Sequence, residues 1–331
     1  MKRILAAVLL SLCMIFLAVS CNKNDDLVKV SVNEVTHSVF YAPQYVAINK
    51  GFFEDEGLEL DFATGEGADK VMAAVLSGSV DIGFSGPEAA IYVYNEGRED
   101  YPMVFAQLTQ RDGAFLVGRE PEPDFEFSSL KGKHVLPGRR GGVPFMTFEY
   151  ILKKNGLDTT TDLNFDDSIQ FSMLAGAFTG GTADYVALFE PTASQLEKEK
   201  RGYIVASIGE AGGDIPYTAY YANKSFIAEN PEVIQKFTNA IYRAQKWINE
   251  NSAEDVAKAI QPSFPDTDLE LLTTVIERYR SIDAWCETPV MNEESFMRLQ
   301  EIISAAGELE KTVRLEAIVD NSFAQKAVEA K

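Results

Sequence analysis

The chain has 331 residues, 46% of them hydrophobic, and carries 50 acidic against 30 basic residues, for a net charge of -20. With 21 Phe and 13 Tyr it has enough apolar material for real cores, which excludes an intrinsically disordered acidic chain. The acidic balance excludes nucleic acid as a partner, because phosphate binding needs a basic surface. Only 2 His and 3 Cys are present, so we expect no metal site and no cofactor.

Residues 1–20 have the features of a secretory signal peptide. Two basic residues precede an apolar run, Ile4 to Val19, that is shorter than the roughly 20 residues of a membrane-spanning helix. Small residues before Cys21 and a polar stretch after it resemble the bacterial lipoprotein signal, in which the cysteine is lipidated and becomes the N-terminus. We therefore expect a lipid anchor on Cys21 and a tether over 21–27, on the extracytoplasmic face of the membrane, periplasmic or outer. Cleavage without lipidation is the alternative.

The next part of the chain alternates predicted strands and helices. In order, the pattern predicts a strand over 27–35, a helix over 42–53, a turn and strand over 54–62, a helix over 69–76, a strand over 80–84, and extended segments over 103–109 and 114–117. This alternation favours an α/β fold with a parallel sheet and helices on its faces.

A short pattern occurs twice, about a hundred residues apart. Gly78-Ser79-Val80-Asp81 and Gly181-Thr182-Ala183-Asp184 each precede an apolar strand and a loop that contains a proline. The same order of helix, turn, strand and loop in both places indicates two similar α/β units.

The connections between the units predict a hinge. Extended segments near 107–111 and 217–220 would carry the chain from one lobe to the other and back, and two crossings make a hinge. We expect a first lobe of residues 28–108 and 220–331 and a second lobe of residues 109–219.

The C-terminal part is predicted to be a helical tail. Apolar residues recur at helical spacing over 231–248, a capped start follows at Ser252, and further amphipathic helices are expected over 268–279 and 293–306. We expect this tail to pack back on the first lobe.

Several motifs together resemble the substrate-binding lipoproteins of ABC importers, in the family that binds aliphatic sulfonates, taurine, nitrate or thiamine-precursor pyrimidines. The motifs are His37 with Tyr41-Ala42-Pro43-Gln44-Tyr45-Val46-Ala47, Lys50-Gly51-Phe52-Phe53, Leu76-Ser77-Gly78-Ser79-Val80-Asp81-Ile82-Gly83, Leu130-Lys131-Gly132-Lys133-His134-Val135 and Asn230-Pro231-Glu232-Val233. The resemblance implies a two-lobe periplasmic-binding-protein-like fold that closes over a small molecule and docks on a membrane permease driven by an ATPase.

Two other functions remain open. The same fold occurs in an enzyme that builds the thiamine pyrimidine with a His and a cysteine-rich stretch; His37 has a counterpart position, but this chain has no cysteine cluster, which counts against the enzyme. An adhesin or sensor lipoprotein would use the fold without transport.

The ligand is expected where loops at the carboxyl ends of strands lead into helix N-termini, since free N–H groups face the crevice there. The candidate ligand-binding residues are His37, Ser38, Tyr41, Glu66, Ser85, Glu88, Arg139, Gly141, Phe189, Glu190 and Tyr217.

These candidates favour different ligands. Carboxylates with aromatic rings favour a flat amine-bearing or cationic heterocycle, such as a thiamine-related pyrimidine, and Glu190 stands out because an unpaired carboxylate in an apolar setting is costly. Arg139-Arg140 in a glycine-rich loop would instead favour a sulfonate or another small anion. The acidic and aromatic candidates outnumber the basic ones, so we favour the heterocycle. His37 and Glu88 also have interpretations that involve no ligand. His37 would be an exposed histidine in a loop, and the charge of Glu88 would complement a helix N-terminus.

Overall fold

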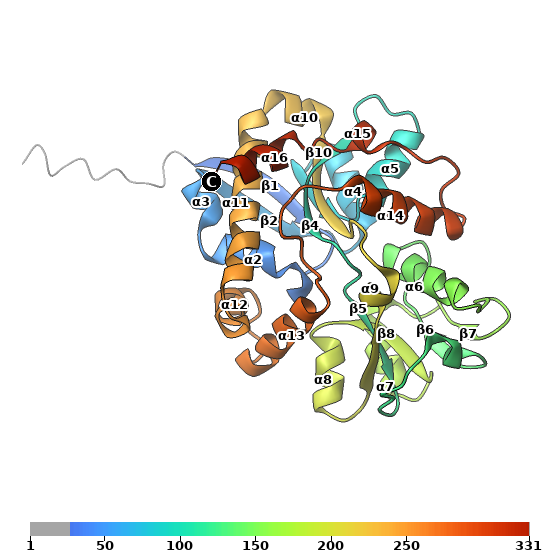
Figure 1. Cartoon of the computed structure of the whole chain (residues 1–331). Coiled ribbons are helices and arrows are strands. Elements are labelled where there is room, and N and C mark those ends of the chain that lie inside the picture. The colour runs from blue at the N-terminus through green and yellow to red at the C-terminus, as the bar shows by residue number, and fades with distance from the viewer. Residues whose placement is uncertain (1–26, 331) are drawn as a thin grey trace, which may run out of the picture.

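The computed structural model describes residues 27–330, which form two five-stranded sheets flanked by helices (Figure 1). The predicted signal peptide and the lipidation of Cys21 lie outside the described residues. We call the first sheet and the helices on it the first lobe; its strand order is β2 Leu58–Thr64, β1 Val28–Glu34, β3 Ile82–Ser85, β10 Thr218–Asn223, β4 Pro102–Thr109. The second lobe has the order β7 Asn164–Phe165, β6 His134–Leu136, β8 Tyr185–Phe189, β5 Ala114–Gly118, β9 Tyr203–Ser207.

Helices lie between most of the strands, and the described chain after β10 forms helices joined by loops. The α-helices are α2 Ala42–Asn49, α3 Phe52–Asp55, α4 Ala68–Leu76, α5 Glu88–Asn95, α6 Val143–Lys154, α7 Leu174–Thr179, α8 Thr192–Lys198, α9 Ile208–Gly212, α10 Lys224–Glu229, α11 Pro231–Glu250, α12 Ala253–Ile260, α13 Leu269–Ser281, α14 Glu293–Ala305, α15 Leu315–Ile318 and α16 Ser322–Glu329. Short 3-10 turns are η1 Val39–Tyr41, η2 Phe127–Leu130, η3 Phe171–Met173 and η4 Gln261–Ser263. Among residues 27–330, no helix has both the length and the apolar character needed to span a membrane.

The repeated pattern has the same structural role in both lobes. Asp81 precedes β3, and its carboxylate accepts the backbone N–H of Ser31 on β1 at 2.8 Å. Asp184 precedes β8 and accepts the N–H of His134 on β6 at 2.9 Å. Each aspartate thus ties the start of one strand to its parallel neighbour, and the prediction of two similar units is confirmed.

The expected parallel pairing is found in both sheets, but each sheet also contains one strand of opposite direction. In the first lobe β10 is antiparallel to β3 and β4, and in the second lobe β5 is antiparallel to β8 and β9. Both strands arrive from the other lobe. The chain leaves each sheet at the end where the carboxyl ends of its parallel strands lie. It enters the other sheet at the corresponding end, so the entering strand, β5 or β10, runs antiparallel to its neighbours.

Two segments connect the lobes, residues 110–113 between β4 and β5 and residues 208–217 between β9 and β10. The second is longer than expected because α9 forms within it. The two segments run together: the Ile215 N–H donates to the Gln110 carbonyl at 2.9 Å, and the Tyr217 N–H to the Thr109 carbonyl at 3.1 Å. The crossings are therefore hydrogen-bonded to each other.

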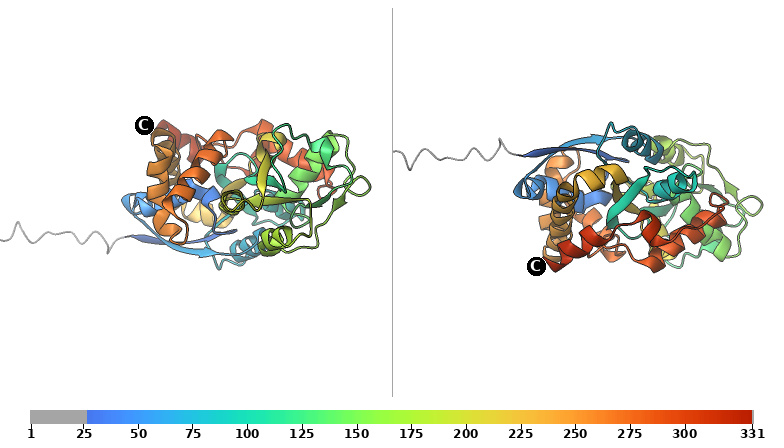
Figure 2. Two further views of the ribbon diagram at one scale, coloured as in Figure 1. Left: turned by 90° about the horizontal axis from the view of Figure 1, so that it is seen from below. Right: turned by 90° about the horizontal axis from the view of Figure 1, so that it is seen from above.

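The expectation that the helical tail packs on the first lobe holds for only part of it. Helices α11 and α12 contact α2, and α16 lies on α11, on the side of the first lobe away from the second (Figure 2). Helix α13 contacts α8, and α14 contacts α6, so both reach the second lobe. Tyr150 donates to Glu301 at 2.6 Å across the α6–α14 contact. The apolar stripes of the tail did not reveal these contacts, because polar side chains such as Tyr150, Glu301 and Arg278 take part in them.

Candidate functional site

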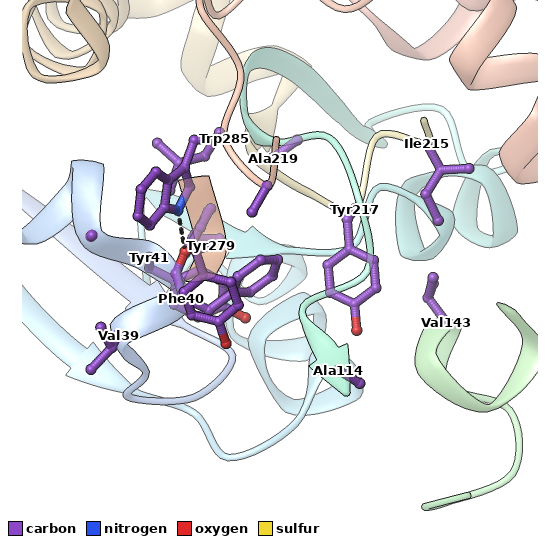
Figure 3. Close-up of a cluster of buried hydrophobic side chains, with 14 of the residues drawn as sticks. Val39, Phe40, Tyr41, Ala114, Val143, Ile215, Tyr217, Ala219, Tyr279 and Trp285 are labelled. Carbon is purple, nitrogen blue, oxygen red and sulfur yellow. Dashed lines mark hydrogen bonds between the residues drawn. The ribbon is translucent and has the colours of Figure 1, made fainter. Parts of the chain in front are cut away.

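An aromatic cluster lies where the two lobes, the crossings and the tail meet (Figure 3). We define it as Phe40, Tyr41, Phe189, Tyr217 and Tyr279, all of which except Phe189 are labelled in Figure 3. The Phe40 ring centroid lies 5.9 Å from Phe189 of the second lobe, 5.5 Å from Tyr217 of a crossing and 5.0 Å from Tyr279 of the tail. Such edge and tilted contacts are those that aromatic rings prefer. Elements distant in the sequence therefore share one set of rings.

The loop after β1 positions two rings of this cluster. Ser38 accepts the N–H of Phe40 at 3.2 Å and so caps η1, which fixes where the next two rings point. Trp285 of the tail donates its ring N–H to the Phe40 carbonyl at 2.8 Å, as Figure 3 shows. At the other side Gly113 leaves room for the Phe40 ring, which a Cβ at that position would meet at 2.7 Å.

Glu88 is buried at the start of α5, after the carboxyl end of β3. It is 6% exposed, and its Oε2 has no hydrogen-bond partner among the described residues. Burial raises the pKa of Glu88 to about 7, and only its own N–H counteracts this. The carboxylate folds back over Gly86, where a Cβ would come within 1.9 Å of Oε2. A buried oxygen without a partner is costly, and a ligand N–H group would satisfy it.

Asp112, in the first crossing, shows the same features, and the sequence analysis missed it. Its side chain is 0% exposed. Oδ1 accepts the N–H of Ala114 at 2.8 Å, whereas Oδ2 has no partner within residues 27–330. Burial raises the pKa of Asp112 to about 7. Its position between two predicted strands, at a predicted crossing, was the signal available in the sequence.

The carboxyl groups of Glu88 and Asp112 both affect the pKa of the same two tyrosines of the cluster. Burial raises the pKa of the Tyr41 and Tyr217 hydroxyls well above the ordinary value; the negative charge of Glu34 raises that of Tyr41 further, and the charges of Glu88 and Asp112 raise both. The two side chains are 3% and 5% exposed. The described part of the chain shows no hydrogen bond from either hydroxyl. Tyr41, Tyr217, Glu88 and Asp112 therefore present unused polar atoms to one region.

Glu190 differs from the expectation of an unpaired carboxylate. It is 2% exposed, but Oε1 lies 2.7 Å from Nη1 of Arg278 and 2.7 Å from the Ser194 hydroxyl, and Oε2 accepts the Ser194 N–H at 2.8 Å. Arg278 also pairs with Glu197 at 2.7 Å. The premise that Glu190 lacks a partner is wrong, because α13 supplies a cation from far along the chain.

His37 lies outside the aromatic cluster. Its Nδ1 is 3.2 Å from Glu34 and 2.9 Å from the Tyr45 hydroxyl, and its Nε2 is 2.8 Å from the carbonyl of Ser263. The ring also stacks against Phe264 at 4.7 Å. Both ring nitrogens are thus engaged by protein atoms.

The remaining predicted residues take internal or surface positions. Ser85 is buried and hydrogen-bonded to the Tyr221 hydroxyl at 2.7 Å. Glu66 has 81% of its side chain exposed beside Lys70, and Arg139 and Gly141 are exposed in the loop before α6. The structure therefore brings together Tyr41, Glu88, Phe189 and Tyr217, and does not bring Glu66, Arg139 or Gly141 to the cluster.

The site's chemistry is that of hydrogen-bond acceptors and flat rings. Two carboxyl oxygens can accept N–H groups, tyrosine hydroxyls can donate or accept, and the rings can cover a planar ligand. Cys286 is buried and burial raises its pKa, so it is a poor nucleophile. In the described range no group of three or more His, Cys, Asp or Glu side chains is arranged to hold a metal ion.

Several known proteins are similar to this chain in sequence. A family model described as NMT1/THI5 like matches residues 39–254. The Bacillus subtilis (strain 168) protein named "Putative binding protein YtlA" is 44% identical over 321 residues, covering 97% of this chain and 96% of the relative. The 4-amino-5-hydroxymethyl-2-methylpyrimidine phosphate synthase of Aspergillus parasiticus is 27% identical over 220 residues, 63% of each chain.

Solved structures show the same fold. The alkanesulfonate-binding protein SsuA from Xanthomonas axonopodis pv. citri, bound to MOPS, matches with a TM-score of 0.71 over 89% of this chain and 98% of that chain. The two are 14% identical, so the match concerns the fold alone. The prediction of a two-lobe periplasmic-binding-protein-like fold with a helical C-terminal region is confirmed.

Proposed function

Because the chain belongs to the NMT1/THI5 like family, we propose that it is the extracytoplasmic solute-binding component of an ABC importer. It captures a small molecule between the two lobes and delivers it to a permease and its ATPase. The observation that carries the proposal is the pair of buried, unpartnered carboxyl oxygens of Glu88 and Asp112 beside the aromatic cluster. The 44% identical relative named as a binding protein supports a binding role.

We propose further that the protein is held at the membrane by a lipid on Cys21. The apolar run, the small residues before the cysteine and the polar stretch after it support this. A lipid-anchored binding protein stays close to its permease, which raises their effective concentration.

The favoured ligand is a flat nitrogen heterocycle or a cationic ring compound, of which thiamine-precursor pyrimidines are an example. Carboxylates accept N–H groups and attract positive charge, and Tyr41, Phe189 and Tyr217 supply ring faces. An anion would meet the negative charges of Glu88 and Asp112 instead. Arg139, the basic candidate for an anion site, is exposed, and neighbouring Arg140 pairs with Asp167 at 2.6 Å.

A thermal-shift screen of the chain from Asn22 onward tests the proposal. The panel contains pyrimidines, other flat nitrogen heterocycles, taurine, alkanesulfonates and nitrate. A ligand at a hundredfold excess over its Kd stabilises the folded state by about 2.7 kcal/mol, which moves Tm clearly. We expect shifts with the heterocycles that are lost in Glu88→Gln and kept in Glu120→Gln, an exposed control.

Other outcomes revise or overturn the proposal. A shift confined to sulfonates and lost in Arg139→Ala reverses the ligand class and leaves the transport role intact. No shift with any compound contradicts a solute-binding role.

A catalytic function is the second candidate, since the synthase relative is 27% identical over 63% of this chain. Recovery of a bound pyrimidine unchanged, and of the protein without a covalent modification at His37, supports binding alone. A mass change in either, measured by mass spectrometry, supports the enzyme.

A further inference from the structure

Asp112 lies in one of the two segments that join the lobes, and its two carboxyl oxygens are in different situations. Oδ1 is used by the protein, since it accepts the N–H of Ala114 at the start of β5. Oδ2 is buried without a partner in residues 27–330. Next to it, the Asp112 carbonyl lies so close to Gly209 of the other crossing that a Cβ there would be 2.2 Å away. The carboxyl group is therefore held firmly, with one oxygen left for something else.

No cation of the described chain neutralises this group. Arg111, its neighbour, has other partners: Nε pairs with Asp214 at 2.7 Å, and Nη1 donates to the Ile282 carbonyl at 2.8 Å. Arg278 of α13 pairs with Glu190 and Glu197. Within the described residues, no cation therefore offsets the free-energy cost of burying the Asp112 carboxylate.

Glu88 presents a second unused oxygen from another element. It belongs to α5 of the first lobe, whereas Asp112 belongs to the crossing, and both act electrostatically on Tyr41 and Tyr217. Two acceptors that approach the same tyrosines from different elements suit a ligand with donor groups at two places on a flat ring system.

We propose that Asp112 Oδ2 is a ligand contact built into the hinge, which accepts an N–H group of a cationic, amidine-like ring compound while Glu88 Oε2 accepts a second one. This inference rests on the proposed function and deepens it, because it assigns the ligand class and a contact residue. Since Oδ1 of the same carboxylate holds Ala114, ligand capture at Oδ2 also fixes the start of β5 relative to the crossing.

The other titratable groups around the two carboxyls are tyrosines and paired ions. Tyr41 from the first lobe, Tyr217 from the second crossing and Tyr279 from α13 face Asp112; Tyr92 and Tyr221 face Glu88. Burial raises the pKa of each of these hydroxyls above its ordinary value, so they stay neutral between pH 5 and 8. Glu34 also raises the pKa of Tyr41 and is hydrogen-bonded to Tyr45, and Glu190 is hydrogen-bonded to Arg278. Below neutral pH, a cationic ligand must then displace protons from Asp112 and Glu88.

Calorimetric titration with benzamidine tests the proposal. The probe is flat, remains cationic over the whole pH range and carries N–H groups, so its own titration does not interfere. Each carboxyl that must lose a proton adds about one unit to the slope of log affinity against pH, well below its pKa. We expect a slope approaching two between pH 5 and 6 for the unmodified chain from Asn22, and about one for Asp112→Asn and for Glu88→Gln.

At pH 8, Asp112→Asn should weaken binding by about tenfold to a hundredfold, the range for a lost charge-assisted hydrogen bond. Asp124→Asn is the matched control, because Asp124 is exposed. Should Asp112→Asn fail to fold, titration of the unmodified chain at pH 5.5 in buffers of different ionisation enthalpy gives the number of protons released, which we expect to approach two.

Three results would overturn the inference. They are an Asp112→Asn protein with the unmodified slope and affinity, release of one proton or fewer, and no binding of benzamidine. If alkanesulfonates still stabilise the chain in that last case, the transport role stands and only the ligand class and the Asp112 contact fail.

Discussion

Four buried carboxyl groups lie near the junction of the lobes, and they fall into two pairs. Glu34 and Glu190 are fully used by the protein: Glu34 accepts from Gln44, Tyr45 and Thr64, and Glu190 from Ser194 and Arg278. Glu88 and Asp112 are equally buried, yet each keeps one oxygen without a partner in the described chain. Burial therefore does not distinguish the two pairs; the number of protein partners does.

The largest expected effect that tests this comparison is the pH dependence of the free energy of unfolding. A carboxyl whose pKa is raised on folding stabilises the protein below its unfolded pKa, and this contribution is lost as pH rises through its folded value, about 7 for Glu88 and Asp112. The ligand-free protein should therefore be less stable at pH 8 than at pH 5, by roughly 3 kcal/mol for each group. Urea unfolding at both pH values should show a smaller loss in Glu88→Gln and in Asp112→Asn. Equal losses in these variants and the unmodified chain would contradict the assignment.

Removal of Arg278, the cation that pairs with Glu190, should have the next largest effect on the free energy of unfolding. Arg278→Ala leaves Glu190 buried without its positive partner, and we expect a loss of about 2–4 kcal/mol in the free energy of unfolding. Arg140→Ala breaks a pair with Asp167 in which the arginine side chain is 65% exposed, and should cost less than about 1 kcal/mol. Similar losses in the two variants would show that Glu190 does not depend on Arg278.

The smallest effect concerns one hydrogen bond of Glu34. Tyr45→Phe removes a donor at 2.6 Å from Oε2, and should destabilise the protein by about 1–2 kcal/mol without affecting ligand binding. Tyr94→Phe is a suitable control, since Tyr94 contacts Tyr101 through its ring. Thermal unfolding with and without ligand measures both properties. A change in the ligand-induced shift would place Glu34 among the binding groups.

The sequence was sufficient for the parts of the fold that depend on local pattern. The apolar stripe over 231–248 predicted α11, and the paired Asp81 and Asp184 motifs predicted the similarity of the lobes. The direction of β5 and β10 was not predictable in this way, because it depends on which lobe a strand comes from rather than on its own residues.

For the site, the sequence predicted which loops contribute residues better than it predicted which groups those residues pair with. Tyr41, Glu88 and Phe189 were chosen because they follow strand ends, and Tyr217 because its ring lies in an expected crossing; the structure brings them together. Glu190 was expected to be unpaired because its partner, Arg278, comes from α13, and no local pattern links the two. Asp112 was missed because a short polar turn between strands resembles any surface turn until its burial is known.

The exchange of strands between the sheets also constrains when each lobe can be completed. All five strands of the second lobe lie within residues 114–207, so its sheet can form from one continuous stretch of chain. In the first lobe β10 lies between β3 and β4, although its residues follow the whole second lobe in the chain. Until residues 218–223 emerge during synthesis, β3 and β4 lack their shared neighbour, so the first sheet cannot close before the strands of the second are all available.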